Sequence, residues 1–193
     1  MTSLSQHEPH HGHRRLRAVH PAEVHPEVFR AALGAHPAGV VVVTGSDGEG
    51  PVGLTATSFV SISLSPPLVG FAVATTSSTW ARLRHADSMV IHLLGHDQDA
   101  IAATFATQHI DRFGEQTTWA PLVTGEPLLT DVRTWLRCRT EEHVALGDHV
   151  LVVARVLDAR VDEDSPDIPA AAPLLYHRRG YRTTGLLAPS TVD

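Results

Sequence analysis

Residues 52–64 read VGLTATSFVSISL, and in this stretch two kinds of side chain alternate with a period of two. One alternate set is mostly apolar, and the other holds mainly glycine, threonine and serine. The first set is Val52, Leu54, Ala56, Ser58, Val60, Ile62 and Leu64; the second is Gly53, Thr55, Thr57, Phe59, Ser61 and Ser63. Such a period indicates a strand with one buried face. The stretch predicts one long strand, or two strands joined by a bend, whose hydroxyl-bearing face meets water or a polar ligand.

Outside this stretch, strand-like runs outnumber helix-like ones. Further strands are predicted at 39–45, 68–75, 88–94, 132–140, 149–161, 173–177 and 180–184. Helices are predicted at 26–36, at 77–86 with Ser77 or Ser78 as the cap, and at 97–108 with Asp97 as the cap and Ile101 and Phe105 inward. Residues 109–125 are predicted to be a loop. Many strands with no alternation of strand and helix indicate an antiparallel barrel or sandwich with two or three inserted helices.

Length and composition fit one domain. The chain has 193 residues, of which 42% are hydrophobic, enough for a full core. We expect this domain to span 26–186, with disordered tails at 1–25 and 187–193. The N-terminus is polar and lacks the apolar centre of a secretory signal, and no apolar run reaches membrane-spanning length, so we expect a cytoplasmic protein without a membrane partner. Cys138 is the single cysteine, which excludes an internal disulfide.

Charge and histidine content exclude two further classes of function. The net charge is −6 and the positive side chains are all arginine, without the clustered basic stripe that nucleic acid requires. The chain has 14 histidines, and the densest group is His7, His10, His11 and His13. Nothing near that group predicts the fixed geometry of a metal site. We therefore expect neither a nucleic-acid partner nor a metal.

Two hydroxyl-rich segments are candidates for ligand binding. Residues 55–58 and 75–79 lie at predicted strand ends, and the second leads into a helix start, where hydroxyls and backbone N–H groups can hold an anion. A solvated strand face with an ordinary helix cap would give the same pattern. Arg112 could bind a phosphate through its planar guanidinium, or could pair locally with Asp111. The residues favour a phosphorylated ligand without deciding between these alternatives.

No familiar catalytic or nucleotide-binding motif is present. The chain lacks the glycine patterns of a Rossmann domain and of a P-loop. His149 begins a β-branched run, a position where histidine is more often structural than catalytic. Cys138 lies on the apolar side of a strand and is predicted to be a buried small hydrophobe. The residues alone predict a β-rich binder of a phosphorylated ligand and leave enzymatic activity open.

Read in order, the segments resemble the flavin reductase family of FMN-binding split barrels, which are NAD(P)H-dependent enzymes and typically reductase components of two-component flavin monooxygenases. The matching segments are FRAALGAHPAGVVVVTG, GLTATSFVSISLSPPLVGFAV, SSTW, AATFAT, DRFGEQTTW, PLLTDVRTWLRCRT, GDHVLVVARV and PLLYHRRGYR, which run from about Phe29 to Thr184. The resemblance implies a mainly β fold, a six-stranded antiparallel Greek-key split barrel with two to three inserted helices, and a homodimer with its flavin sites near the subunit interface. It implies hydride transfer from NADH or NADPH to FMN or FAD, and diffusive delivery of reduced flavin to a monooxygenase.

The resemblance also implies roles for individual residues. Those placed around the flavin are Thr55, Ala56, Thr57 and Ser58 at the ring edge and ribityl chain, Ser61, Ser63, Ser77 and Thr79 near ribityl or phosphate oxygens, Phe105 and Ala106 beside the flavin, and Arg112 at the phosphate. His149 matches the histidine of a Gly-Asp-His motif close to the nicotinamide, which makes it the catalytic candidate. Tyr176 would close the same region.

Some features depart from the family pattern, and other functions remain open. Ala154 stands where the family often has glycine, and the turn at 177–180 reads HRRG where a second glycine is common. A non-enzymatic split barrel that carries or senses flavin or haem is an alternative, with the tail histidines and His109 as haem candidates. A related oxidase acting on a pyridoxine-type phosphate is a third possibility.

Overall fold

The computed structural model describes residues 24–161 and 172–184. Both predicted tails, the N-terminal histidine group and the acidic connection after Val161 lie largely or wholly outside these residues. The chain forms two units, residues 1–33 and 34–193. Helix α1 (Pro26–Gly34) was predicted correctly. Its apolar side chains Val28, Phe29 and Leu33 are exposed.

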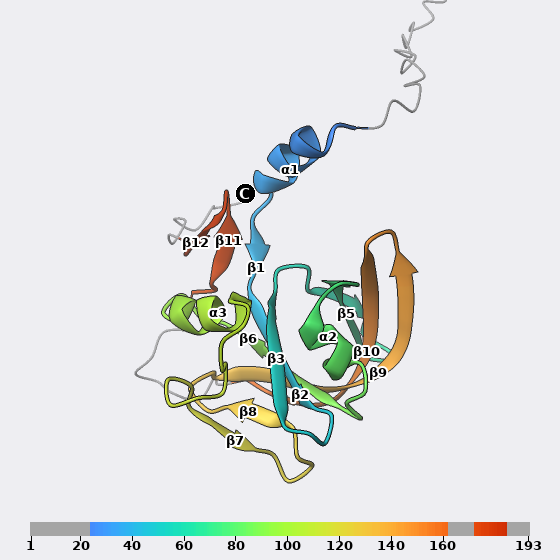
Figure 1. Ribbon diagram of the computed structural model, residues 1–193, viewed down its shortest axis with the longest axis vertical. Coiled ribbons are helices and arrows are strands. Elements are labelled where there is room, and N and C mark those ends of the chain that lie inside the picture. Colours follow the sequence, from blue (N-terminus) through green and yellow to red (C-terminus); the bar gives the residue numbers. More distant parts are fainter. Residues whose placement is uncertain (1–23, 162–171, 185–193) are drawn as a thin grey trace, which may run out of the picture. The chain divides into compact units, whose positions relative to one another are not determined.

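The predicted antiparallel β fold is confirmed in its general class. The main sheet has seven strands in the order β3-β2-β6-β9-β10-β5-β4, and each pair of neighbours is antiparallel (Figure 1). Its strands are β2 (Val41–Ser46), β3 (Pro51–Ala56), β4 (Val60–Ser63), β5 (Leu68–Ala74), β6 (Met89–Leu93), β9 (Thr134–Leu146) and β10 (His149–Arg160). The more specific prediction of a six-stranded Greek-key barrel stays a prediction.

Two smaller sheets and two short helices complete the described fold. One sheet contains β1 (Ala38–Gly39), β11 (Leu175–His177) and β12 (Gly180–Arg182), and the other pairs β7 (Trp119–Pro121) with β8 (Pro127–Leu129). Helices α2 (Ser78–Leu83) and α3 (Asp99–Ala106) both contact β3, and Figure 1 shows them on either side of that strand. Strand β3 therefore lies between the two helices that carry much of the site described below.

The stretch 52–64 forms two strands, β3 and β4, joined by a bend, which was one of the two predicted arrangements. In β3 the apolar set Val52, Leu54 and Ala56 is buried. The expectation of one continuous buried face is wrong for β4, where Val60 and Ile62 are 48% and 47% exposed. β3 and β4 are the two edge strands of the sheet, but α2 and α3 both pack on β3, whereas the main contacts of β4 are with its neighbour β5.

The main core receives side chains from β3, at one end of the sheet order, and from β5, next to the other end. Apolar side chains of β3 and β5 pack in one cluster with residues of β2, β6, β9 and β10. Phe71, Met89 and Ile91 have no exposed surface. Cys138 is equally buried, and its burial raises the thiol pKa to about 12. The prediction that Cys138 is an inert small hydrophobe is thus confirmed.

Two local predictions need correction. The cap of α3 is Gln98 and not Asp97, because the side chain of Gln98 links Gly95 N–H to the carbonyl of Asp131 and so fixes the helix start. The predicted loop 109–125 contains β7 and leads into the β7–β8 hairpin, whose short strands carry too little periodicity to be recognised. By contrast, Ser77 caps α2 as expected and accepts a hydrogen bond from Trp80 N–H.

A buried ionic network attaches the β7–β8 hairpin to the main sheet. Glu126 is 2% exposed and accepts hydrogen bonds from Ser88, Thr124 and Arg137, the last at 2.6 Å from Nε. Burial alone would raise the pKa of Glu126, but these donors outweigh it and hold the pKa below its ordinary value. Glu126 therefore stays ionised and holds the hairpin against β9.

The substitution Gly53→Ala is expected to destabilise the protein by about 2 kcal/mol, since overpacking a tight contact typically costs 1–3 kcal/mol. A Cβ on Gly53 would lie 2.6 Å from Cε1 of Phe105, a ring that is 1% exposed, and 3.1 Å from the carbonyl oxygen of Val43. Urea unfolding measures the effect. Gly39→Ala is the matched control, because a Cβ there meets nothing within 4 Å. Equal stabilities for the two variants would contradict this reading of the packing.

Candidate functional site

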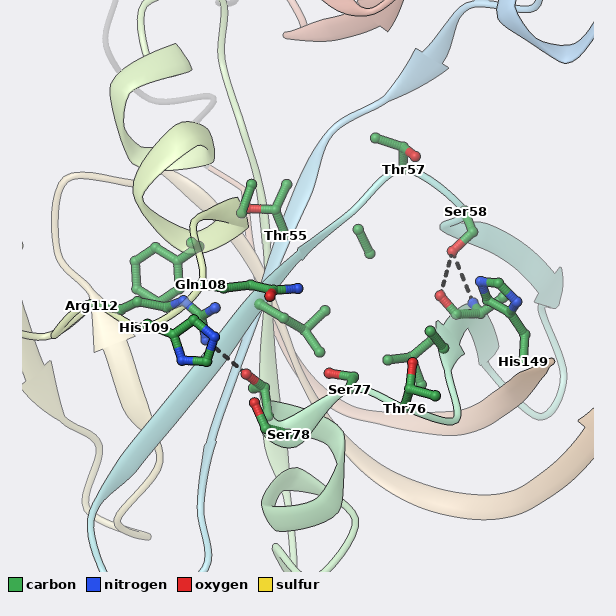
Figure 2. A pocket seen from close by; sticks show the side chains of 18 residues that line it. Thr55, Thr57, Ser58, Thr76, Ser77, Ser78, Gln108, His109, Arg112 and His149 are labelled. Carbon is green, nitrogen blue, oxygen red and sulfur yellow. Dashed lines mark hydrogen bonds between the residues drawn. The ribbon is translucent and has the colours of Figure 1, made fainter. Parts of the chain in front are cut away.

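A cavity of about 620 Å³ lies where the ends of β3 and β5 approach α2, the end of α3 and the start of β10. Figure 2 shows its lining, with Arg112 and His149 at opposite sides and hydroxyl groups between them. Its volume is within the range of small-molecule and cofactor pockets, roughly 300–1,000 Å³. The walls come from four stretches of the chain, 54–58, 72–79, 105–112 and 149, which only the folded structure brings together.

Most of the residues expected around a ligand line this cavity. Those that do are Thr55, Ala56, Thr57, Ser58, Ser77, Thr79, Phe105, Ala106, Arg112 and His149. Ser61, Ser63 and Tyr176 do not line it. Ser61 and Ser63 lie on edge strand β4, and Tyr176 lies on β11 in a different sheet.

Several hydroxyls of the cavity are already engaged within the protein. Thr55 donates to the carbonyl of Ala102 at 2.7 Å, which ties β3 to α3. The Ser58 hydroxyl donates to the Ala72 carbonyl and accepts from the Ala72 N–H, both at 2.9 Å. It thus bonds both backbone polar groups of Ala72, as the backbone of a neighbouring strand would. These side chains shape the walls, and any ligand contact at 55–58 falls mainly to the backbone and to Thr57.

Arg112 is a positive charge held rigidly in the cavity wall. Its guanidinium donates to the carbonyls of Thr107 and Gly53 and, at 2.7 Å, to the hydroxyl of Thr79. Among the described residues no carboxylate lies within ion-pair distance of it, and Asp111 accepts from Phe113 N–H instead. The alternative of a local pair with Asp111 is therefore wrong. Burial lowers the pKa of Arg112, as expected for a cation without a counter-ion.

His149 occupies the other side of the cavity with a fixed ring. Its backbone pairs with Ala74 at the end of β5, and its Nδ1 lies 2.7 Å from Oδ1 of Asp148. This hydrogen bond lowers the pKa of Asp148, so the carboxylate stays charged and orients the imidazole. The ring is half-exposed, which leaves Nε2 available to a ligand that enters the cavity.

Eight further residues line the cavity. They are Leu54, Ala72, Val73, Ala74, Thr76, Ser78, Gln108 and His109. Thr76 and Ser78 belong to the hydroxyl run at 75–79, which was already a candidate for ligand binding. His109 was named only as a haem candidate, and Gln108 gave no signal in the sequence; His109 has a φ of 61°, a conformation that residues other than glycine seldom adopt.

Within 24–161 and 172–184, no group of three or more His, Cys, Asp or Glu side chains is placed to hold a metal ion. The helices of the same residues are too short or too polar for any to cross a bilayer.

Comparisons with known proteins agree on one family. Residues 33–185 match the family described as "Flavin reductase like domain". An NADH:FMN oxidoreductase of Rhodococcus erythropolis is 50% identical over 159 residues, covering 82% of each chain. The flavin-dependent monooxygenase reductase subunit HsaB of Rhodococcus jostii is 33% identical over 176 residues, covering 91% of this chain and 85% of that one.

A solved structure agrees with these sequence matches. The flavin reductase domain protein from Arthrobacter sp. FB24 superimposes with a TM-score of 0.76 at 31% identity, covering 85% of this chain and 98% of the other. The chain belongs to the flavin reductase like domain family.

Proposed function

We propose that this protein is an NADH-dependent flavin reductase that reduces FMN in the cavity between β3, β5, α2 and α3. The observation that carries the proposal is a cavity of cofactor size with an unpaired, immobilised arginine at one side and an oriented histidine at the other. The oxidoreductases of the same family, at up to 50% identity, support the choice of NADH and FMN.

The described residues fit a flavin mononucleotide. A phosphate needs a cation that is not already neutralised, and Arg112 provides one. The ring system needs an apolar wall and backbone polar groups, which the ends of β3 and β5 offer at Ala56, Val73 and Ala74. We propose that the phosphate lies at the Arg112 side and the ring toward the His149 side.

Bound flavin supplies the redox chemistry, because its ring accepts a hydride from the nicotinamide. The protein's own contribution is positioning and exclusion of water. Arg112 fixes the ligand's anionic end, and the strand ends fix the plane of the ring. His149, held by Asp148, hydrogen-bonds the nicotinamide through Nε2 and so favours its approach. No proton transfer by a side chain is required.

The family resemblance extends the proposal to assembly and fold. We propose a homodimer in which the domain at 26–186 forms a split barrel. The exposed apolar side chains of edge strand β4 support the dimer, since a second subunit would cover them. The packing of β3 against β5 supports the barrel, because β3 is one end of the sheet order, β5 is next to the other end, and both contribute to one core.

We further propose that reduced flavin leaves by diffusion for a separate monooxygenase, as the relationship to a reductase subunit supports. The described cavity opens to solvent beside exposed residues such as Thr57 and Ser78, so a bound flavin has a route out. A cytoplasmic location agrees with the single buried thiol and with dependence on NADH.

A steady-state assay tests the proposed function. Purified protein is supplied with FMN or FAD and with NADH or NADPH, and the loss of the near-ultraviolet absorbance of the reduced nicotinamide is followed. Oxidation of NADH that depends on added FMN is the expected result. Tight flavin binding without oxidation of either nicotinamide would instead identify a carrier. A haem protein would show its own visible spectrum after purification.

The substitution His149→Ala is expected to raise the KM for NADH about three- to tenfold, the value of one hydrogen bond of 0.5–1.5 kcal/mol. The dissociation constant for FMN should change less, because in the proposed complex the phosphate of FMN stays bound to Arg112 on the other side of the cavity. Steady-state kinetics measures the KM for NADH, and flavin titration measures the dissociation constant for FMN. His85→Ala is the control, an exposed histidine outside the cavity. Equal losses in both quantities would contradict a role for His149 toward the nicotinamide.

A further inference from the structure

Arg112 closes a short loop in the cavity wall. Its guanidinium donates twice to the carbonyl of Thr107, from Nε at 3.0 Å and from Nη2 at 2.7 Å, and this contact ties the two ends of 108–111 together. Gln108 and His109, at the start of the loop, line the cavity. The next two residues line a separate, smaller hollow, so the chain turns away from the cavity directly after His109.

His109 has an unusual backbone conformation at this turn. Its φ of 61° lies in the left-handed region, which among the described residues other than glycine is shared only by Arg178 and Arg179. Such a conformation is unfavourable for a residue with a side chain, and it persists where the surrounding structure fixes it, often at ligand sites. The closed loop fixes it here and holds the imidazole at the cavity. In Figure 2, His109 lies on the same side of the cavity as Arg112, and His149 lies on the other.

The hydrogen bonds of Arg112 show that a bound phosphate needs further donors. Of the five N–H groups of the guanidinium, four are committed to Thr107, Gly53 and Thr79, and a single one on Nη2 is left for a ligand. A phosphate monoester presents three strong acceptor oxygens. Arg112 therefore supplies the charge that attracts a phosphate but too few donors to satisfy it.

The ring nitrogens of His109 are available for this purpose. Among the described residues, the histidine side chains that form hydrogen bonds within the protein are His92 and His149. His109 is exposed and lines the cavity without a protein partner among those residues. An imidazole carries one N–H donor in either neutral tautomer and two when it is protonated. His109 thus offers a donor on the side of the cavity where Arg112 offers too few.

We propose that His109 binds the phosphate of FMN together with Arg112 and so helps the cavity to select FMN over riboflavin. A ring N–H of His109 donates to one phosphate oxygen, while the remaining N–H of Arg112 donates to another. Riboflavin has the same ring and ribityl chain without the phosphate, so it gains nothing from this contact. The inference rests on the proposed function, since it assumes that the flavin phosphate lies at the Arg112 side.

Removing the imidazole tests the proposal. In His109→Gly, the ratio of the dissociation constant for FMN to that for riboflavin is expected to rise about tenfold, a loss of about 1.4 kcal/mol in FMN binding. Glycine adopts a φ of 61° without strain, so the loop keeps its shape while the donor is lost. His109→Asn tolerates the same conformation and keeps a shorter donor, so it is expected to give an intermediate ratio. Flavin fluorescence titration measures both constants in each variant.

Arg179→Gly is the matched control. Arg179 has a closely similar φ of 63° in the β11–β12 turn, and it does not line the cavity. This variant relieves the same kind of backbone strain and removes a positive charge, yet it should leave the ratio at its wild-type value. An unchanged ratio in His109→Gly would overturn the proposal. An equal loss of affinity for both flavins would overturn it as well, because it would show that His109 only shapes the loop.

An NMR measurement tests the contact in the wild-type protein. The ring signals of His109 are expected to shift more on saturation with FMN than on saturation with riboflavin, and equal shifts would refute the contact with the phosphate. These experiments measure binding alone. A protein that shows the expected ratios but oxidises no NADH would refute the reductase function and leave the phosphate contact intact. A protein that reduces FMN but keeps its ratio in His109→Gly would refute the contact and leave the function intact.

Discussion

Arg112→Met is expected to weaken FMN binding about 10- to 100-fold, since hydrogen bonds to a charged group are worth roughly 1.5–3 kcal/mol. Arg112 lies in the cavity wall with no carboxylate partner among the described residues, and in the proposed complex the phosphate is its counter-ion. Methionine keeps much of the aliphatic volume and removes the charge. Riboflavin, which lacks the phosphate, should lose much less affinity in the same variant.

Comparing FMN with riboflavin distinguishes two roles of Arg112, binding of the phosphate and anchoring of the loop. Arg112 also ties the loop at 107–113 to β3 and α2, so its loss can disturb the cavity as a whole. Such a disturbance would weaken the binding of FMN and of riboflavin equally. Equal losses of affinity for the two ligands would show that Arg112 serves only as a loop anchor. Arg112→Lys retains the charge without the planar fork and should fall between the wild type and the methionine variant. Flavin fluorescence titration with both ligands provides the measurements.

Lowering the pH from 7 to 4 is expected to cost about 3 kcal/mol of folding stability through His92 alone, at 1.36 kcal/mol for each unit of pKa difference. His92 has no exposed surface. Its Nδ1 donates to the carbonyl of Val42 at 3.1 Å, and its Nε2 accepts from Leu129 N–H at 3.0 Å. Protonation would break the second bond and leave a charge in the core. Burial therefore lowers the pKa from 6.5 to about 4, against the smaller opposing effect of the Val42 hydrogen bond.

The sign of the effect follows from where the proton binds. Between pH 6.5 and about 4, His92 is protonated in the unfolded chain but not in the folded protein. The free energy of unfolding therefore falls as the pH falls through this window. Glu126 has a lowered pKa, so its contribution is lost only below the ordinary glutamate value, at more acidic pH. Urea unfolding at a series of pH values measures the combined curve, and its upper part contains the contribution of His92 together with that of His143, whose pKa is also lowered by burial and by Arg84.

A variant and a spectroscopic measurement isolate the histidine. His92→Gln can donate and accept a hydrogen bond but does not titrate, so its stability should vary less between pH 7 and pH 5 than that of the wild type. The NMR signals of the His92 ring in the wild-type protein offer a test that does not depend on how the variant folds. A ring that titrates near its ordinary pKa in the folded protein would show that the proposed linkage is wrong.

The elements predicted most accurately are those whose burial is set by the local pattern. Strands β2, β5 and β10 are β-branched runs flanked by turn residues, and their residues were assigned almost completely. The cap of α2 was found because Ser77 satisfies backbone groups within its own turn. The cap of α3 was missed because Gln98 is fixed by Asp131, which lies 33 residues further along the chain. The exposure of β4 was missed because the covering of an edge strand depends on helices from other parts of the chain, and α2 and α3 pack mainly on the opposite edge strand, β3.

The sequence by itself determined the mainly β class, the two hydroxyl-rich strand ends, the buried nature of Cys138 and, through the order of its segments, the flavin reductase resemblance. These depend on periodicity, residue chemistry and order along the chain, which are local or one-dimensional. Only the tertiary structure decided that Arg112 has no carboxylate partner among the described residues, that His149 faces the same cavity and that Tyr176 does not line it. Arg112 is held by Gly53 and Thr79, which lie 59 and 33 residues away. Such partners are chosen by how the strands and helices pack around the core, and no local pattern along the chain encodes that choice.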